Sequence, residues 1–179
     1  MRTLDHARTA LVLIDLMERI VGLPLEPRTG DAVVDAALTL AGESRAVGAP
    51  VIAVRVERPN VTEQPPGSEL VASVAELADA VVVKRTIGGF YGTGLHELLQ
   101  QRGVDTLVFA GIATNLGVES TARAAADHGY DVVFVEEGMA ALTAEEHEAA
   151  ISLNLPRFGD VVRLTNLKWS QRASECSRM

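Results

Sequence analysis

The sequence is poor in several kinds of residue, and each shortage excludes a class of protein. Its single cysteine, Cys176, excludes an intramolecular disulfide framework and a multi-cysteine metal site, and it is typical of a reducing cytoplasm. Basic residues are outnumbered, with 16 Lys and Arg against 24 Asp and Glu. The resulting net charge of -8 argues against binding to nucleic acid or to an anionic membrane. No apolar run approaches the ~20 residues of a membrane span.

What the sequence does contain predicts one globular domain. Hydrophobic residues make up 47% of the 179 residues, which is enough for a buried core. The first residues, from Met1 to His6, form no apolar segment of the kind that a signal peptide carries, so we expect a cytoplasmic protein. We place the domain at residues 1–167 and expect residues 168–179 to form a polar tail that contains Cys176.

Short apolar runs alternate with segments of helical spacing along most of the chain. The runs are rich in Val, Ile and Leu, which is typical of parallel strands covered on both faces. They comprise Ala10–Ile14, Val51–Val56, Val81–Val83, Leu107–Ala110, Val132–Val135 and Val161–Leu164. Helices are indicated at Val33–Ala41, from about Thr93 to Gly103, at Val118–His128, and from Thr143, which forms a capping-box pattern with Glu146. This alternation predicts an α/β fold with a doubly wound parallel sheet.

Polar residues stand where three of these strands end, and ligands of open parallel sheets bind at that edge. Asp15 ends the first run, Lys84 ends the third, and the fourth leads into the turn Gly111–Gly117. Lys84 stands out because the chain has 14 arginines but only two lysines. Each feature also has a purely structural explanation. Asp15 could cap the loop after its strand, Lys84 could reach solvent, and the turn could be an ordinary strand-to-helix connection capped by Asn115.

Three segments resemble motifs of the isochorismatase-like hydrolase superfamily, also called the cysteine hydrolases. They are Leu11–Asp15, Val83–Arg85 with Phe90–Thr93, and Gly111–Arg123, in family order, within a match from about Thr9 to Leu164. The resemblance implies a three-layer α/β/α, Rossmann-like fold with a six-stranded parallel sheet. It also implies assembly as a homodimer or homotetramer.

Hydrolytic members of this superfamily carry an Asp–Lys–Cys triad, in which the Cys attacks a carbonyl. Asp15 and Lys84 match the first two positions, but Gly117 stands at the position of the nucleophile. Acyl-thioester chemistry cannot proceed through a residue that lacks a side-chain nucleophile. The resemblance further implies a cis peptide bond between Ile112 and Ala113, with the backbone N–H groups of Ala113 and Gly117 forming an anion pocket.

Isochorismatases proper resemble this pattern, with Gly in place of Cys, and they cleave a vinyl ether to release pyruvate. That reaction needs a general acid to protonate the enol carbon, and the resemblance implies Asp15 for this role. Lys84 would lower the pKa of the Asp15 carboxyl whereas burial would raise it, so protonation requires burial to dominate or a substrate that brings negative charge. We therefore expect nucleophile-independent hydrolysis of a small carboxylate substrate. The alternative is an inactive small-molecule binding or regulatory homologue.

The expected substrate pocket departs from the family pattern. Met17 and Ile20 replace a glutamine and an aromatic residue, and Gly88 and Gly89 replace Ser-Ala before Phe90. The residues expected to contact the substrate are Met17, Arg85, Phe90 and Asn115, and a substrate carboxylate could be bound by Arg19, Arg55, Arg58 or Arg85.

The sequence predicts neither a metal nor a cofactor. Some family amidases bind zinc or iron through Asp-x-His and further histidines after the second strand, but no histidine lies between His6 and His96. His96, His128 and His147 fall on predicted helices, and we expect them at the surface rather than at a metal. The expected partner is a small-molecule substrate.

Overall fold

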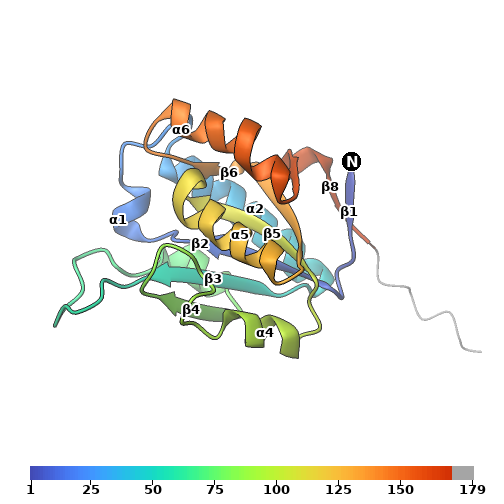
Figure 1. Cartoon of the computed structure of the whole chain (residues 1–179), viewed down its shortest axis with the longest axis horizontal. Coiled ribbons are helices and arrows are strands. Elements are labelled where there is room, and N and C mark those ends of the chain that lie inside the picture. The colour runs from blue at the N-terminus through green and yellow to red at the C-terminus, as the bar shows by residue number, and fades with distance from the viewer. Residues whose placement is uncertain (171–179) are drawn as a thin grey trace, which may run out of the picture.

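A computed structural model describes residues 1–170 of the chain (Figure 1). Its main sheet has six strands in the order β4-β3-β2-β5-β6-β7, and every neighbouring pair is parallel. The strands are β2 (Thr9–Ile14), β3 (Val51–Val56), β4 (Ala80–Lys84), β5 (Thr106–Ile112), β6 (Asp131–Ala140) and β7 (Asp160–Val162). The six strands predicted from the apolar runs are therefore confirmed.

The continuous apolar runs form strands because helices cover both faces of the sheet. All six residues of β2 are buried, and successive side chains point to opposite faces. Leu11 and Leu13 belong to one core cluster, and Val12 and Ile14 belong to the other. The first cluster contains side chains of α2 (Gly30–Val47) and α3 (Ala72–Leu77); the second contains side chains of α4 (Leu95–Gln101) and α5 (Glu119–Asp127). The three-layer α/β/α fold is thus confirmed (Figure 1).

The ends of the predicted helices follow from local side-chain chemistry. Thr29 caps α2 by accepting a hydrogen bond from the backbone N–H of Ala32 at 3.3 Å, and α2 ends at Gly48, whose φ of 83° favours glycine. The capping box at Thr143 and Glu146 is confirmed at the start of α6 (Ala144–Ala149). Shorter helical turns are α1 (Glu18–Val21), η1 (Thr114–Val118), η2 (Ala150–Asn154), η3 (Leu155–Arg157) and η4 (Leu164–Asn166).

A second, two-stranded sheet joins the two ends of the described chain. β1 (Arg2–Leu4) pairs in parallel with β8 (Leu167–Trp169), and both Leu4 and Leu167 are buried. The regular structure therefore extends to Trp169, two residues beyond the domain end expected at residue 167. The difference arises because the partner strand of β8 lies more than 160 residues away, beyond the reach of any local pattern. Cys176 lies outside the described residues.

The strand order creates a switch point between β2 and β5. The chain leaves β2 toward β3 on one side of the sheet and leaves β5 toward β6 on the other. Loops after β2 and β5 therefore diverge, and a crevice at the carboxyl ends of such strands is where ligands bind in open α/β sheets. Among residues 1–170, no helix is long and apolar enough to cross a membrane.

Candidate active site

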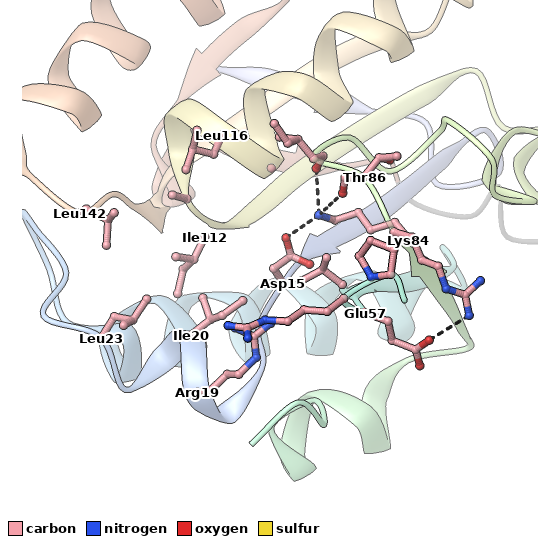
Figure 2. A pocket seen from close by; sticks show the side chains of 17 residues that line it. Asp15, Arg19, Ile20, Leu23, Glu57, Lys84, Thr86, Ile112, Leu116 and Leu142 are labelled. Atoms are coloured by element: carbon pink, nitrogen blue, oxygen red, sulfur yellow. Dashed lines mark hydrogen bonds and ion pairs between the residues drawn. The ribbon is translucent and has the colours of Figure 1, made fainter. Parts of the chain in front are cut away.

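A cavity of about 470 Å³ opens at the carboxyl ends of the central strands (Figure 2). Its volume falls in the range typical of small-molecule sites. The lining side chains come from the segments after β2, β3, β4 and β5, together with Leu142. Several residues singled out from the sequence line this cavity, among them Asp15, Lys84, Arg85, Ala113 and Gly117.

Asp15 follows β2 directly and is held in an unusual backbone conformation. Its φ is +54°, in the left-handed region that few residues other than glycine, Asn and Asp adopt. The Asp15 N–H donates to the Val54 carbonyl at 2.8 Å, and the Asp15 carbonyl accepts from the Met17 N–H at 2.8 Å. These bonds turn the chain away from the sheet and leave the side chain at the cavity, where Asp15 is only 5% exposed.

Lys84 is the last residue of the edge strand β4, and its ammonium reaches inward. Nζ lies 2.8 Å from Oδ2 of Asp15 and donates hydrogen bonds to the carbonyls of Thr86 at 3.2 Å and Ile87 at 2.8 Å. Figure 2 shows these three contacts converging on the ammonium. Because Lys84 is 2% exposed, the alternative in which it reaches solvent is wrong. A compact ammonium with three donors suits this position better than the planar guanidinium of arginine.

The pKa of the Asp15 carboxyl is raised above its ordinary value. Burial is the largest cause, and it outweighs the opposing effects of the Lys84 ammonium and of the Arg19 guanidinium. The second oxygen, Oδ1, is buried and has no hydrogen-bond partner within residues 1–170. Asp15 thus combines one oxygen paired with Lys84 and one buried oxygen that has no hydrogen-bond partner among residues 1–170.

The turn after β5 contains the cis peptide bond that the resemblance implied, between Ile112 and Ala113. The carbonyl of Ala113 accepts hydrogen bonds from the N–H groups of Leu116 at 3.1 Å and Val118 at 3.2 Å, which forms the wide turn η1 ahead of α5. Ala113, Leu116 and Gly117 consequently line the cavity, at the N-terminal end of a helical segment. Such ends carry partial positive charge and favour anions.

Gly117 lies directly against Asp15. A Cβ atom added to Gly117 would stand 3.0 Å from Oδ2 of Asp15 and 3.0 Å from Cγ2 of Ile14. A side chain at this position would therefore begin beside the Asp15 carboxylate. Thr121, one helical turn further along α5, holds Gly117 in place. Its Oγ1 donates to the Gly117 carbonyl at 2.6 Å and accepts from the Gly89 N–H at 2.9 Å.

The structure brings some of the expected substrate contacts to the cavity and leaves others elsewhere. Arg19, Arg58 and Arg85 line it, whereas Met17, Phe90, Asn115 and Arg55 are not among its lining residues. Met17 is fully buried in the core, and Phe90 packs against the rings of His128 and Tyr130 at centroid distances of 5.1 and 6.0 Å. The sequence analysis missed Leu23, Glu57 and Leu142, which come from separate loops and share no pattern.

His147 is buried, so its expected surface position is wrong. It is 3% exposed, and its Nδ1 lies 2.8 Å from Oγ1 of Thr114, the first residue of η1. Burial is the main cause that lowers the pKa of His147 to about 4, and the nearby Arg28 adds to it. The capping box just before His147 indicated where α6 begins, but it carries no information on which face of the helix is buried. No group of three His, Cys, Asp or Glu side chains within the described chain could hold a metal ion.

A family model described as Isochorismatase domain matches residues 9–166. The chain belongs to the isochorismatase family. It is 39% identical over 178 residues to the uncharacterized isochorismatase family protein YecD of Escherichia coli O157:H7, covering 90% of this chain and 95% of that relative. It is also 30% identical to the maleamate amidohydrolase of Pseudomonas putida, covering 87% of this chain and 83% of that enzyme.

Solved structures of the isochorismatase family share the fold. An isochorismatase family protein from Burkholderia thailandensis superposes with a TM-score of 0.83 and 34% sequence identity, over 92% of this chain and 95% of that chain. These comparisons confirm the superfamily and the fold that the three sequence motifs indicated. One of these relatives is named as an amidohydrolase, and the reaction of this chain has to be argued from its own cavity.

Proposed function

We propose that the protein hydrolyses a small carboxylate substrate without an enzyme nucleophile, with Asp15 as general acid and base. The observation that carries this proposal is the state of the Asp15 carboxyl. It is buried at the cavity with a raised pKa, and one of its oxygens has no partner within residues 1–170. A raised pKa favours the protonated form of a carboxyl, and a protonated carboxyl at the cavity can deliver its proton to a bound substrate.

Gly117 occupies the position of the cysteine nucleophile in this proposal. Support comes from the position of its missing Cβ, which would begin 3.0 Å from Asp15 Oδ2. A thiol attached to this Cβ would lie close to the Asp15 carboxylate, as proton transfer between a nucleophile and its base requires. Without a thiol at residue 117, the thioester route of the cysteine hydrolases is closed at this position, and no cysteine occurs in residues 1–170.

Cleavage of a vinyl ether is the reaction that fits a lone carboxyl. Protonated Asp15 transfers its proton to the terminal carbon of the enol ether, and the electron pair of the C=C bond forms the new C–H bond. Water then attacks the resulting oxocarbenium carbon and returns a proton to the Asp15 carboxylate. The hemiketal that forms then collapses: its C–O bond to the alcohol breaks and its hydroxyl proton passes to the leaving oxygen. The products are an alcohol and a keto acid, and Asp15 ends the cycle protonated.

Lys84 and the turn after β5 have supporting roles in this scheme. The Lys84 ammonium is fixed by two carbonyls and by Asp15, so it orients the carboxyl and stabilises its ionised form after proton transfer. The backbone of Ala113 and Gly117 lines the cavity at the start of a helical segment, where it favours a carboxylate of the substrate. No metal or cofactor enters this scheme.

A second candidate function is binding without turnover. The absence of a side chain at residue 117 favours it, because the cavity then retains only an ion pair and a backbone anion pocket. The ion pair itself argues for the enzyme, since burying two charges is costly and a simple binding site does not require it.

Pyruvate release from isochorismate, followed for the wild type and for Asp15→Asn, tests the proposed function. We expect the substitution to lower the rate at least ~10²-fold. Asp127→Asn, at an exposed aspartate of α5, is the matched control and should keep the wild-type rate. Equal rates for wild type and Asp15→Asn would refute the role of Asp15. Absence of turnover with retained ligand binding in both proteins would favour the binding function.

A further inference from the structure

The ionisable side chains that line the cavity are not all paired. Of its two carboxylates, Asp15 pairs with Lys84 at 2.8 Å, and Glu57 pairs with Arg85 at 3.2 Å. Glu57 also pairs with Arg55 at 2.8 Å, so both of its oxygens are engaged. Two further cavity arginines, Arg19 and Arg58, have no carboxylate partner within the part of the chain that the structure describes.

Arg19 is held in place at the cavity while keeping donors available. Its Nε lies 3.3 Å from Oγ of the buried Ser68, and its backbone N–H donates to the Gly67 carbonyl at 3.0 Å. Neither Nη group of Arg19 has a hydrogen-bond acceptor among residues 1–170. Figure 2 shows Arg19 beside Ile20 on α1, below Asp15 in this view. The two Nη groups form the fork that matches the two oxygens of a carboxylate.

Arg58 is positioned by its backbone rather than by its side chain. The amide of Gln64 binds the main chain of Arg58 twice, accepting from its N–H at 2.9 Å and donating to its carbonyl at 3.1 Å. This closes the loop after β3 into a small ring. The guanidinium of Arg58 is exposed at the cavity and offers a second positive charge to a ligand.

The rest of the wall is apolar. Ile20, Leu23, Ile112, Leu116 and Leu142 line the cavity, and three of them are unusually exposed for leucine, at 42% for Leu23 and 47% for both Leu116 and Leu142. A ligand that covers these side chains gains the free energy of removing apolar surface from water. The cavity thus joins a positively charged end to an apolar wall.

We propose that Arg19, assisted by Arg58, selects substrates that carry a carboxylate next to the reacting bond on an otherwise apolar body. The position of the reacting bond rests on the proposed function, because Asp15 defines it. Arg85, which the sequence placed among the substrate contacts, is not the selecting residue, since its guanidinium is already paired with Glu57. The chemical class is therefore an amphipathic organic acid, such as an enol-ether carboxylate with a hydrocarbon ring or chain.

A carboxylate bound to Arg19 would also raise the pKa of Asp15. The charge of Arg19 lowers the pKa of Asp15, against the larger effect of burial. The charged groups around Asp15 are Lys84 from β4, Arg19 from α1, and Glu57, Arg58 and Arg85 from the loops after β3 and β4. A ligand carboxylate offsets the charge of Arg19 and adds a negative charge, so substrate binding favours the protonated acid.

The test uses a carboxylate that contains no hydrolysable bond. Cyclohexanecarboxylate and its neutral analogue cyclohexylmethanol are titrated into the full-length protein near neutral pH, and their dissociation constants are measured by NMR. We expect Arg19→Gln to weaken carboxylate binding about tenfold and to leave the alcohol unchanged, because hydrogen bonds between charged groups are lost only for the acid. The retained affinity for the alcohol also shows that the variant is folded.

Three further variants make the assignment specific. Arg58→Gln should weaken carboxylate binding about threefold, and Arg85→Gln should weaken it less than Arg19→Gln does. Arg102→Gln changes the net charge by the same amount at the amino-terminal end of the sheet, and should bind the carboxylate like the wild type. An equal loss in Arg85→Gln, or a carboxylate affinity that Arg19→Gln leaves unchanged, would overturn the proposal.

The binding experiment with Arg19→Gln can succeed or fail independently of the proposed hydrolysis by Asp15. If Arg19→Gln loses discrimination between acid and alcohol while Asp15→Asn keeps normal turnover, the selection by Arg19 stands and the role of Asp15 fails. If ligand binding favours protonated Asp15, the wild type should bind the carboxylate more tightly as the pH is lowered. Asp15→Asn should not show this pH dependence. A pH dependence that is identical in the two proteins would refute this coupling.

Discussion

His147 provides a quantitative test of how the site is supported. Its imidazole is buried against Thr114, and its pKa is lowered from 6.5 to about 4, chiefly by burial. In the unfolded chain the same imidazole has its ordinary pKa of 6.5. The native state therefore binds fewer protons than the unfolded state between these two pKa values, and the free energy of unfolding falls as the pH is lowered through this window.

The size of the effect follows from the two pKa values. The stabilising contribution is fully present above pH 6.5 and is lost as the pH falls toward about 4. The complete loss corresponds to about 3 kcal/mol, and about 2 kcal/mol of it is lost by pH 5. His147→Asn removes the titrating group and keeps a polar atom near the position of Nδ1, so that Thr114 retains a hydrogen-bond partner.

Urea denaturation measured from about pH 7.5 to pH 5 would show the difference. We expect the stability of His147→Asn to fall less than that of the wild type over this range, by about 2 kcal/mol. His128→Asn, at an exposed histidine, is the matched control and should follow the wild-type curve. Parallel curves for the wild type and His147→Asn would refute the conclusion that His147 is buried in its neutral form.

Two further substitutions test the ion pair and the glycine beside it. Lys84→Met leaves the buried Asp15 without its counter-charge and should cost about 3–5 kcal/mol near pH 7.5. The cost should shrink as the pH is lowered, because removal of the Lys84 ammonium raises the pKa of Asp15 further and so favours its protonated form. Urea denaturation at pH 7.5 and at about pH 5 checks this, and a cost that grows on acidification would contradict it. Gly117→Cys, made with Cys176→Ser, should destabilise the protein by about 1 kcal/mol, since the new Cβ stands 3.0 Å from Asp15 Oδ2 and its neighbours must shift. The new thiol should react with iodoacetamide, and Asp15→Asn in the same background should change that rate. A thiol that reacts equally fast with or without Asp15 would argue against Gly117 as the nucleophile position.

Local sequence patterns predicted the elements that carry the site. Uninterrupted Val, Ile and Leu runs indicated the six parallel strands, because a strand buried on both faces cannot alternate with polar residues. The same reasoning placed Asp15, Lys84 and the turn to Gly117 at one edge, since all parallel strands end on the same side of the sheet. The distance of 2.8 Å between Asp15 and Lys84 agrees with that expectation.

Other features depended on partners that are distant in the chain. β1 forms because it pairs with β8, and its three residues carry no periodic signal of their own. His147 is buried because α6 packs beside η1, where Thr114 meets its ring. Neither contact could be read from the residues around it.

The four candidate arginines, three of which line the cavity, illustrate the same division. All of them lie near the ends of strands, and nothing in their local sequence separates Arg19 and Arg58 from Arg55 and Arg85. The separation comes from Glu57, which accepts from Arg55 and Arg85, and from Ser68, which accepts from Arg19.

The sequence alone thus determined the strands, their common edge and the acid and amine that stand there. The tertiary structure decided whether burial or ion pairing governs Asp15, and which guanidinium groups are available to a ligand. Hydrophobic periodicity is a property of neighbouring residues, whereas desolvation and charge pairing depend on side chains that only folding brings together.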